Sequence, residues 1–327
     1  MMITRRKIVT AIGACALGAS RAGLAQTAPP AVRRIGILSP IDQPTYPVLV
    51  DALRRLGYED GKNAQLLLRS AKSDYGRLPA LARELIDAQV EVIVAINTPG
   101  AQAAINATKT IPVIMTLVGD LVGTGFITSL ARPGTNITGL SFVSSDLAGK
   151  RLEIVREMVP RARTVAILFD ARNANARLEL AAALDAARQL KLAASTYELQ
   201  NEGAILSARD GAHAAKADLL YAVFEGNIAA RRRYELAAYA LWLRRPMVSG
   251  WSGITDAGGL ISYAPAIAPM FRRAAYYVHR LLQGAQPNDL PVEQPTLFET
   301  VVNAVTAKRF GIKLPESILL RAGRVIE

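Results

Sequence analysis

Two mainly apolar runs, each with a single polar residue (Glu91 and Thr116), lie on either side of a short polar segment between residues 90 and 117. Apolar runs of this length without a regular polar alternation are typical of parallel strands that are covered on both faces. The pattern predicts a buried strand at Val90–Ile96, a polar turn at Asn97–Gly100, a helix at Ala101–Thr108 and a second buried strand at Ile111–Leu117. Proline within the turn suits the start of the helix, where its missing N–H is not needed.

The same alternation of strand and helix patterns runs along most of the chain. Strands that alternate with helices indicate parallel pairing and right-handed crossovers. The pattern restarts after residue 143, so we predict an α/β fold of two doubly wound parallel-sheet lobes with a cleft between them. The further predicted strands are 34–38, 65–69, 137–143, 164–169, 193–198, 219–224, 247–248, 260–263 and 298–303. The further predicted helices are 46–56, 78–88, 126–131, 149–158, 176–190, 201–215, 228–243, 267–283 and 304–310, with a short turn at 315–319 and Trp242 in the core.

Small polar side chains follow the strands of the first lobe. Because ligands bind at the carboxyl ends of strands in open parallel sheets, these residues predict half of a small-ligand site. The turn amides beside Asn97 and the Thr98 hydroxyl are placed to hold a ligand carboxylate at a helix start. Ser39 and Thr116 offer hydroxyl groups from neighbouring strand ends, and Asp120 is either an acceptor for a ligand amine or a helix cap. The alternative is an ordinary strand–turn–helix with solvated caps.

The second lobe has polar and aromatic residues at equivalent positions. Asp170 and Glu225 follow strands and are predicted to pair with a ligand ammonium group. Trp251 and Tyr263 are predicted to pack on an apolar or aromatic moiety of the ligand. For both aromatic residues the alternative is packing in the core or at a hinge.

Residues 1–25 have the features of an export signal peptide. Arg5, Arg6 and Lys7 precede a short apolar stretch that is too short to span a bilayer, and small residues at 23–25 offer a cleavage site near Ala25. The adjacent arginines also resemble a twin-arginine signal. The only cysteine, Cys15, lies in this segment, so a processed chain has no disulfide, no thiol nucleophile and no zinc–thiolate site.

The remaining chemistry of the chain argues against several function classes. The formal net charge is +12, but the basic residues are spread along the chain without interleaved aromatics, so we expect a solvated surface and no nucleic-acid partner. No histidine has the spacing of a catalytic triad, and no dinucleotide or phosphate-loop motif is present. We therefore expect no enzyme activity and no cofactor.

Several ordered runs resemble one known family. They are Arg33–Pro40, Val118–Asp120 with Gly123–Gly125, Ser129–Gly134 with Asn136–Phe142, Gly149–Glu153, Ala257–Tyr263, and Leu290–Thr296 with Phe298, Glu299, Asn303 and Thr306–Lys308. Together they resemble the ABC-transporter substrate-binding family, which includes exported tryptophan- and tyrosine-binding proteins. The resemblance covers residues 33–327.

The resemblance implies a type I periplasmic-binding fold with three hinge crossings, near Phe142, Tyr263 and Val292. Lobe one would then comprise 31–141 plus 264–291, and lobe two 142–263 plus 292–327. It also implies a periplasmic monomer that closes on a small ligand, such as an aromatic amino acid or a related small organic acid. The ligand would pass to the permease and ATPase subunits of an importer at the inner membrane.

Two other classes share this architecture. Ligand-sensing repressors have the same two-lobe fold but place a helix-turn-helix before the first lobe, where this chain has the predicted export signal. An exported α/β enzyme that uses the same cleft is the second alternative.

Overall fold

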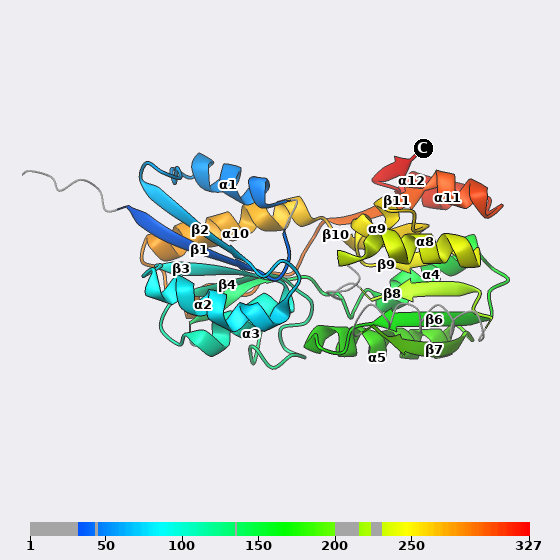
Figure 1. The fold of residues 1–327 in the computed structure, drawn as a ribbon, viewed down its shortest axis with the longest axis horizontal. Helices are drawn as coiled ribbons and strands as arrows, with labels where there is room; N and C mark the ends of the chain where they lie inside the picture. Colours follow the sequence, from blue (N-terminus) through cyan, green and yellow to red (C-terminus); the bar gives the residue numbers. More distant parts are fainter. Residues whose placement is uncertain (1–31, 43–44, 135, 200–215, 224–230) are drawn as a thin grey trace, which may run out of the picture. The chain divides into compact units, whose positions relative to one another are not determined.

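A computed structural model describes residues 32–327 apart from 43–44, 135, 200–215 and 224–230. In the described residues, two mainly parallel sheets with helices on both faces form the fold (Figure 1). The predicted α/β class with two doubly wound sheets is therefore confirmed. The residues at which lobe one passes into lobe two stay a prediction.

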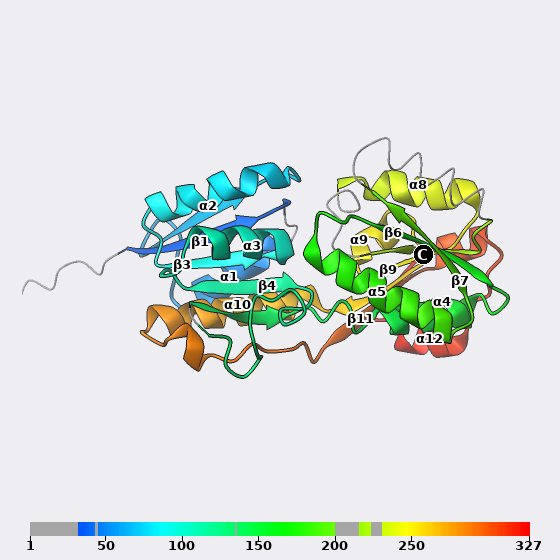
Figure 2. The same cartoon turned by 90° about the horizontal axis from the view of Figure 1, so that it is seen from below.

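The first sheet has the order β2-β1-β3-β4-β5, and all its pairs are parallel. Helices α1 and α10 cover one face, and α2 and α3 cover the other (Figure 2). The strands are β1 (Arg33–Ser39), β2 (Ala64–Ser70), β3 (Val92–Ile96), β4 (Val113–Val118) and β5 (Ile137–Ser141). The helices are α1 (Tyr46–Arg55), α2 (Leu78–Asp87), α3 (Asn97–Ala107) and α10 (Ile267–Leu282), with short 3-10 turns at Tyr75–Arg77 and Pro287–Asp289.

The unbroken apolar character of β3 follows from this layering. Alternate side chains of a strand point to opposite faces of its sheet. Val92, Val94 and Ile96 join the core under α1 and α10, whereas Ile93 and Ala95 join the core under α2 and α3. Both faces are buried, so every position along the strand is apolar.

The second sheet has the order β12-β11-β10-β9-β8-β6-β7. Helices α4, α5, α11 and α12 contribute to the core on one face, and α8 and α9 to the core on the other. The strands are β6 (Thr164–Phe169), β7 (Ala193–Glu198), β8 (Leu219–Ala222), β9 (Met247–Ser249), β10 (Ile261–Pro265), β11 (Phe298–Asn303) and β12 (Arg324–Ile326). The helices are α4 (Ala148–Met158), α5 (Ala174–Gln189), α8 (Arg233–Leu243), α9 (Ser252–Asp256), α11 (Ala304–Arg309) and α12 (Glu316–Arg321).

One strand pair departs from the parallel pattern, because β10 and β11 are antiparallel. The chain leaves the second sheet at Pro265, forms α10 against the first sheet, and returns at Phe298, which pairs with Pro265. A strand that starts where its neighbour ends must run in the opposite direction.

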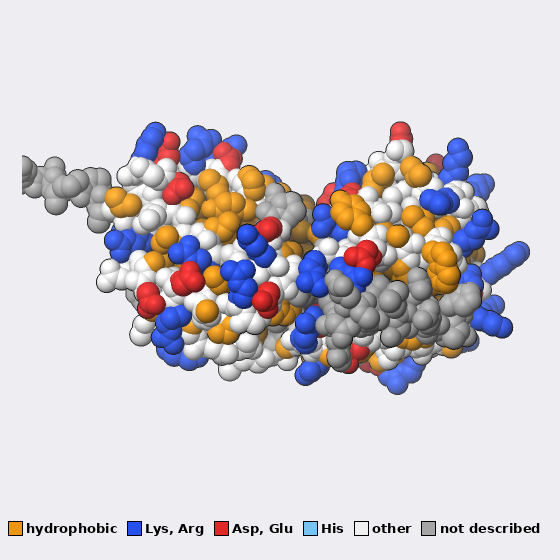
Figure 3. All heavy atoms as spheres, viewed as in Figure 1, with side chains coloured by type: hydrophobic (Ala, Val, Ile, Leu, Met, Phe, Trp, Pro, Cys, Tyr) orange, Lys and Arg blue, Asp and Glu red, His pale blue; other side chains and the backbone are white. Residues whose placement is uncertain are grey.

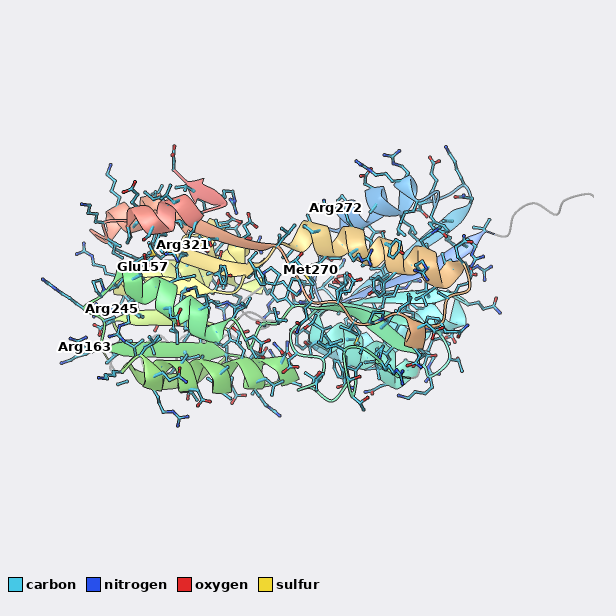
Figure 4. All side chains as sticks on the ribbon, turned by 180° about the vertical axis from the view of Figure 1, so that it is seen from behind. Glu157, Arg163, Arg245, Met270, Arg272 and Arg321 are labelled. Atoms are coloured by element: carbon cyan, nitrogen blue, oxygen red, sulfur yellow. The ribbon has the colours of Figure 1, made fainter. Side chains whose placement is uncertain are left out.

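On the helices, most apolar side chains face the core and most charged side chains face outward. On α10, Met270 is buried and Arg272 points to the outer side (Figure 4). Glu157 of α4 and Arg321 of α12 form an ion pair of 2.7 Å that joins these two helices (Figure 4).

Figure 3 shows Lys and Arg side chains interspersed with Asp and Glu on one face, as expected for a solvated surface. None of the described helices is both long and apolar enough to cross a membrane.

Several element predictions are wrong. Residues 126–131 form bends and not a helix, because the Ser129 hydroxyl bonds the backbone of Arg132 in competition with helix formation. The predicted turn at 97–100 is already helix α3, since Asn97 takes a left-handed backbone (φ 58°) and turns the chain in one residue.

The end of the chain and helix α8 also differ from the sequence-based prediction. The predicted turn at 315–319 lies largely within helix α12, which is followed by the unpredicted strand β12, and the short helix α9 was also not predicted. Trp242 is 60% exposed, because α8 buries Leu236, Tyr239 and Ala240 on a different face. The helix predicted at 201–215 lies outside the described residues.

Candidate functional site

Three residues with left-handed backbones lie at the carboxyl ends of three adjacent strands. Asn97 follows β3 (φ 58°), Leu117 lies in β4 (φ 57°) and Val143 follows β5 (φ 46°). A β-branched residue in this region is a genuine outlier, and such strain collects at functional sites. Strands β3, β4 and β5 are neighbours in the sheet, so the strain marks one edge, where the polar strand-end residues were predicted to bind a ligand.

The beginning of α3 lines a cavity at this edge. Asn97 and Thr98, its first two residues, are buried. The cavity has a volume of about 240 Å³, and Thr98 and Pro99 line it together with Tyr75, Arg172 and Asn173. Elements of both sheets therefore meet at the N-terminus of α3, where backbone N–H groups favour an anion.

Buried polar side chains without hydrogen-bond partners lie near the same edge. Asn175, in the first turn of α5, has no exposed surface, and neither its amide oxygen nor its amide nitrogen has a partner among the described residues. The hydroxyl groups of Thr116 and Ser145 are likewise buried and without a partner in that part of the chain. Buried polar groups are normally paired, and leaving them unpaired costs free energy.

Asn175 and Ser145 were not predicted as site residues. Asn175 belongs to a polar segment that follows the strand ending at Phe169, so the strand-end rule applied to Asp170 could have found it. Its proximity to the first sheet had no signal in the sequence. A Cβ atom added to Gly119, just after β4, would lie 2.0 Å from the Asn175 amide nitrogen. Only a glycine allows α5 to approach the end of β4 so closely.

Two carboxylates next to Gly119 and Ser145 in the sequence, Asp120 and Asp146, lie near enough for their charges to interact. One oxygen of Asp120 accepts a hydrogen bond from the Gly123 backbone N–H at 2.8 Å, so Asp120 caps a turn and not a helix. Partial burial and the nearby Asp120 charge raise the pKa of Asp146 above its ordinary value. Two like charges held together disfavour their charged forms, and a ligand ammonium group would relieve this repulsion.

Replacing Asp146 with asparagine should therefore stabilise the ligand-free protein at pH 7. We expect the unfolding midpoint to rise by about 1 °C, the scale of a surface change. The ionised Asp146 carboxylate destabilises the folded protein, and this free-energy cost is full above the raised pKa of the folded state. The cost shrinks as the pH falls through that pKa, and it disappears below the ordinary aspartate pKa of about 3.9. Thermal unfolding of Asp146→Asn from pH 7 to 3.5 checks this, with Asp185→Asn, which loses an ion pair to Arg188, as the control. A lower midpoint for Asp146→Asn at pH 7 would contradict it.

Two predicted residues already have partners within the protein. The buried Ser39 hydroxyl donates a hydrogen bond to the Ile41 backbone oxygen at 2.5 Å. The fully buried Asp170 carboxylate accepts two bonds from the Arg172 guanidinium, at 2.7 and 2.8 Å. A ligand ammonium would have to compete with Arg172 for Asp170, so the predicted role of Asp170 requires a rearrangement.

The predicted aromatic residues occupy two different environments. Trp251 is half-buried and lines a cavity of about 760 Å³, with Asp42, Lys72, Arg233 and Glu299 among its other lining residues. Tyr263 stacks on Phe298 with ring centroids 5.8 Å apart, a contact between the paired strands β10 and β11. Glu225 lies outside the described residues.

Two α/β sheets joined by several crossings, with polar side chains at their strand ends, define the architecture of the two-lobed solute-binding proteins. The family model described as ABC transporter substrate binding protein matches residues 34–326, and the chain belongs to this family. The family is a class of solute-binding proteins and not of enzymes, and its members typically act outside the cytoplasm. The resemblance read from the sequence is thus confirmed.

Individual relatives agree with this assignment. A tyrosine-binding protein of Clostridioides difficile (strain R20291) is 27% identical over 290 residues, which span 86% of this chain and 81% of that protein. The crystal structure of a conserved domain protein from Vibrio cholerae O1 biovar El Tor has a TM-score of 0.85 at 26% identity, covering 90% of this chain and 99% of that one. A domain from Streptococcus pneumoniae in complex with L-Trp has a TM-score of 0.82 at 24% identity with the same coverage, and shares the fold.

Proposed function

We propose that this protein binds an aromatic amino acid or a related small organic acid as the substrate-binding component of an ABC importer. The observation that carries the proposal is the set of buried, unpaired polar groups of Thr116, Ser145 and Asn175 at the carboxyl edge of the first sheet. The start of α3 suits a ligand carboxylate, and the carboxylates of Asp120 and Asp146 suit an ammonium group. The tyrosine-binding relative supports this ligand class.

Binding would work by a shift between open and closed forms. A ligand that touches groups on both sides, Thr116 from β4 and Asn175 from α5, favours the form in which these groups are close together. Trp251 would pack on the ring of an aromatic ligand that extends towards its cavity. Of the predicted site residues, the proposal retains Thr98, Thr116 and Asp120 and adds Asn175.

The cellular setting follows the family. The N-terminal segment has the composition of an export signal, so the protein would act in the periplasm and pass its ligand to permease and ATPase subunits at the inner membrane. In this role the protein would bind its ligand as a monomer, without a cofactor and without converting the ligand chemically.

Calorimetry with L-tyrosine, L-tryptophan and benzoate tests the proposal. We expect at least one of them to bind with a Kd near or below about 1 μM, equivalent to about −8 kcal/mol. Asn175→Ala should weaken that binding by about tenfold to a hundredfold, because the amide loses its bonds to the ligand. Asn288→Ala, at an exposed asparagine, is the control and should bind as the wild type does. The absence of binding by all three compounds, or equal affinity of Asn175→Ala and wild type, would refute this assignment.

A further inference from the structure

A buried polar network surrounds Arg151 of α4. The side chains of Arg151 and Glu179 have no exposed surface, and they form an ion pair of 2.9 Å. Arg151 Nη1 also donates to the Tyr221 hydroxyl at 3.1 Å, and Tyr221 donates to Glu179 at 2.7 Å. The second carboxylate oxygen of Glu179 accepts a hydrogen bond from the Ser144 hydroxyl.

The same guanidinium binds the backbone of two segments that connect the sheets. Arg151 Nη1 donates to the backbone oxygen of Ser144 at 3.0 Å, and Arg151 Nε donates to that of Tyr263 at 2.8 Å. Ser144 lies where the chain passes from β5 to α4, and Tyr263 lies in β10, from which the chain passes to α10 on the first sheet. One side chain thus holds two connections between the sheets.

The network also reaches the helix that carries Asn175. Glu179 lies four residues after Asn175 on α5, so the two side chains are on the same face of the helix, one turn apart. A fixed Glu179 therefore fixes the position of Asn175 relative to Arg151 and Ser144. On the other side of Ser144, Val143 has the strained left-handed backbone.

Stability alone is a poor reason for this arrangement. Replacing a buried ion pair with apolar residues of similar volume is often neutral or stabilising, because both charges must be removed from water. A planar guanidinium whose Nη1 and Nε donate to a carboxylate and two backbone oxygens supplies geometry instead, which an ammonium group cannot copy.

We propose that Arg151 is a positioning residue for ligand binding. It joins α4, α5 and the connections at Ser144 and Tyr263 into one rigid unit with the second sheet. Movement between the sheets is then confined to the first-sheet side of this unit, beginning at Val143. The part of this inference that concerns affinity rests on the proposed function, and the part that concerns the connections does not.

Hydrogen–deuterium exchange of the ligand-free protein tests whether Arg151 holds the two connections. In Arg151→Lys we expect the amides of residues 141–146 and 261–266 to exchange about tenfold faster, while those of β3 and β4 keep their rates. Tyr221→Phe, which keeps the ion pair and loses only the hydroxyl, should give a smaller change in the same segments. It serves as the test variant if Arg151→Lys does not fold. Lys150→Met, at an exposed neighbour that pairs with Glu153, is the control.

Calorimetry with L-tyrosine, well below the unfolding temperature of each variant, tests whether Arg151 affects ligand affinity. We expect Arg151→Lys to bind about tenfold more weakly and Lys150→Met to bind normally. A purely structural role would lower the unfolding temperature and leave this affinity unchanged, which would overturn the inference. Unchanged exchange in the two segments would also overturn it. If the wild type does not bind L-tyrosine, the exchange arm alone decides the inference, and the failure falls on the ligand assignment.

Discussion

Gly139→Ala should destabilise the protein by about 4 kcal/mol, at the upper end of single-substitution effects. Gly139 lies in β5 with φ 145°, and an added Cβ atom would lie 2.0 Å from the backbone oxygen of Met115 and 2.6 Å from its backbone nitrogen. These atoms belong to β4, which pairs with β5 and has an irregular register between Met115 and Val118. Backbone atoms cannot rotate away as a side chain does, so the strands would have to separate.

Urea denaturation measures this effect, and a second glycine provides the control. Gly149 lies in α4, and its added Cβ atom would meet only the Ala186 Cβ atom at 3.5 Å, an ordinary contact. Gly149→Ala should therefore leave stability unchanged or raise it by up to about 1 kcal/mol, since alanine favours a helix over glycine. Equal stability of the two variants would show that β5 tolerates a side chain at Gly139.

Gly119→Ala should weaken ligand binding by about a hundredfold, equivalent to about 2.8 kcal/mol. The added Cβ atom would occupy the space of the Asn175 amide, with all three nearest atoms within 2.2 Å. Asn175 must then turn away or α5 must move, and either change displaces its amide from the position in which we propose that it binds the ligand. Because Gly119 has no positive φ to preserve, the protein should fold with little loss of stability.

The double variant shows whether Asn175 transmits the effect. If Gly119→Ala acts only by displacing the amide, Gly119→Ala combined with Asn175→Ala should bind no more weakly than Asn175→Ala alone. Calorimetry with the ligand that binds the wild type best gives all four affinities. Additive losses in the double variant would contradict a shared mechanism, and normal binding by Gly119→Ala would contradict the close contact.

The hydrophobic pattern predicted most of the fold because it records burial. β3 is apolar at every position because both faces of its sheet are covered, and α2 has one apolar face because it covers only one side. The pattern failed where local hydrogen bonds decide the conformation, as at Ser129, and where strand direction depends on the route of the chain, as at β11. Trp242 was misplaced because an apolar residue on a helix can lie on its outer face.

The candidate site was only partly predictable. The strand-end rule pointed to Thr98, Thr116 and Asp120, which lie at the edge of the first sheet where we propose the ligand to bind. It also selected Ser39 and Asp170, whose hydrogen-bonding groups are taken by Ile41 and Arg172 within the protein. Which polar groups remain without a partner depends on side-chain orientation, which sequence spacing does not determine.

The amino-acid sequence by itself determined the two α/β units and the family, since strand and helix periods and ordered motifs are local properties. Only the tertiary structure brought Asn175 onto Gly119, and Arg151 onto Glu179, Tyr221 and the two connections. These groups are far apart along the chain. Their contact depends on how the helices pack on the sheets. Many side chains contribute to the packing energy, so no single sequence motif predicts the contact.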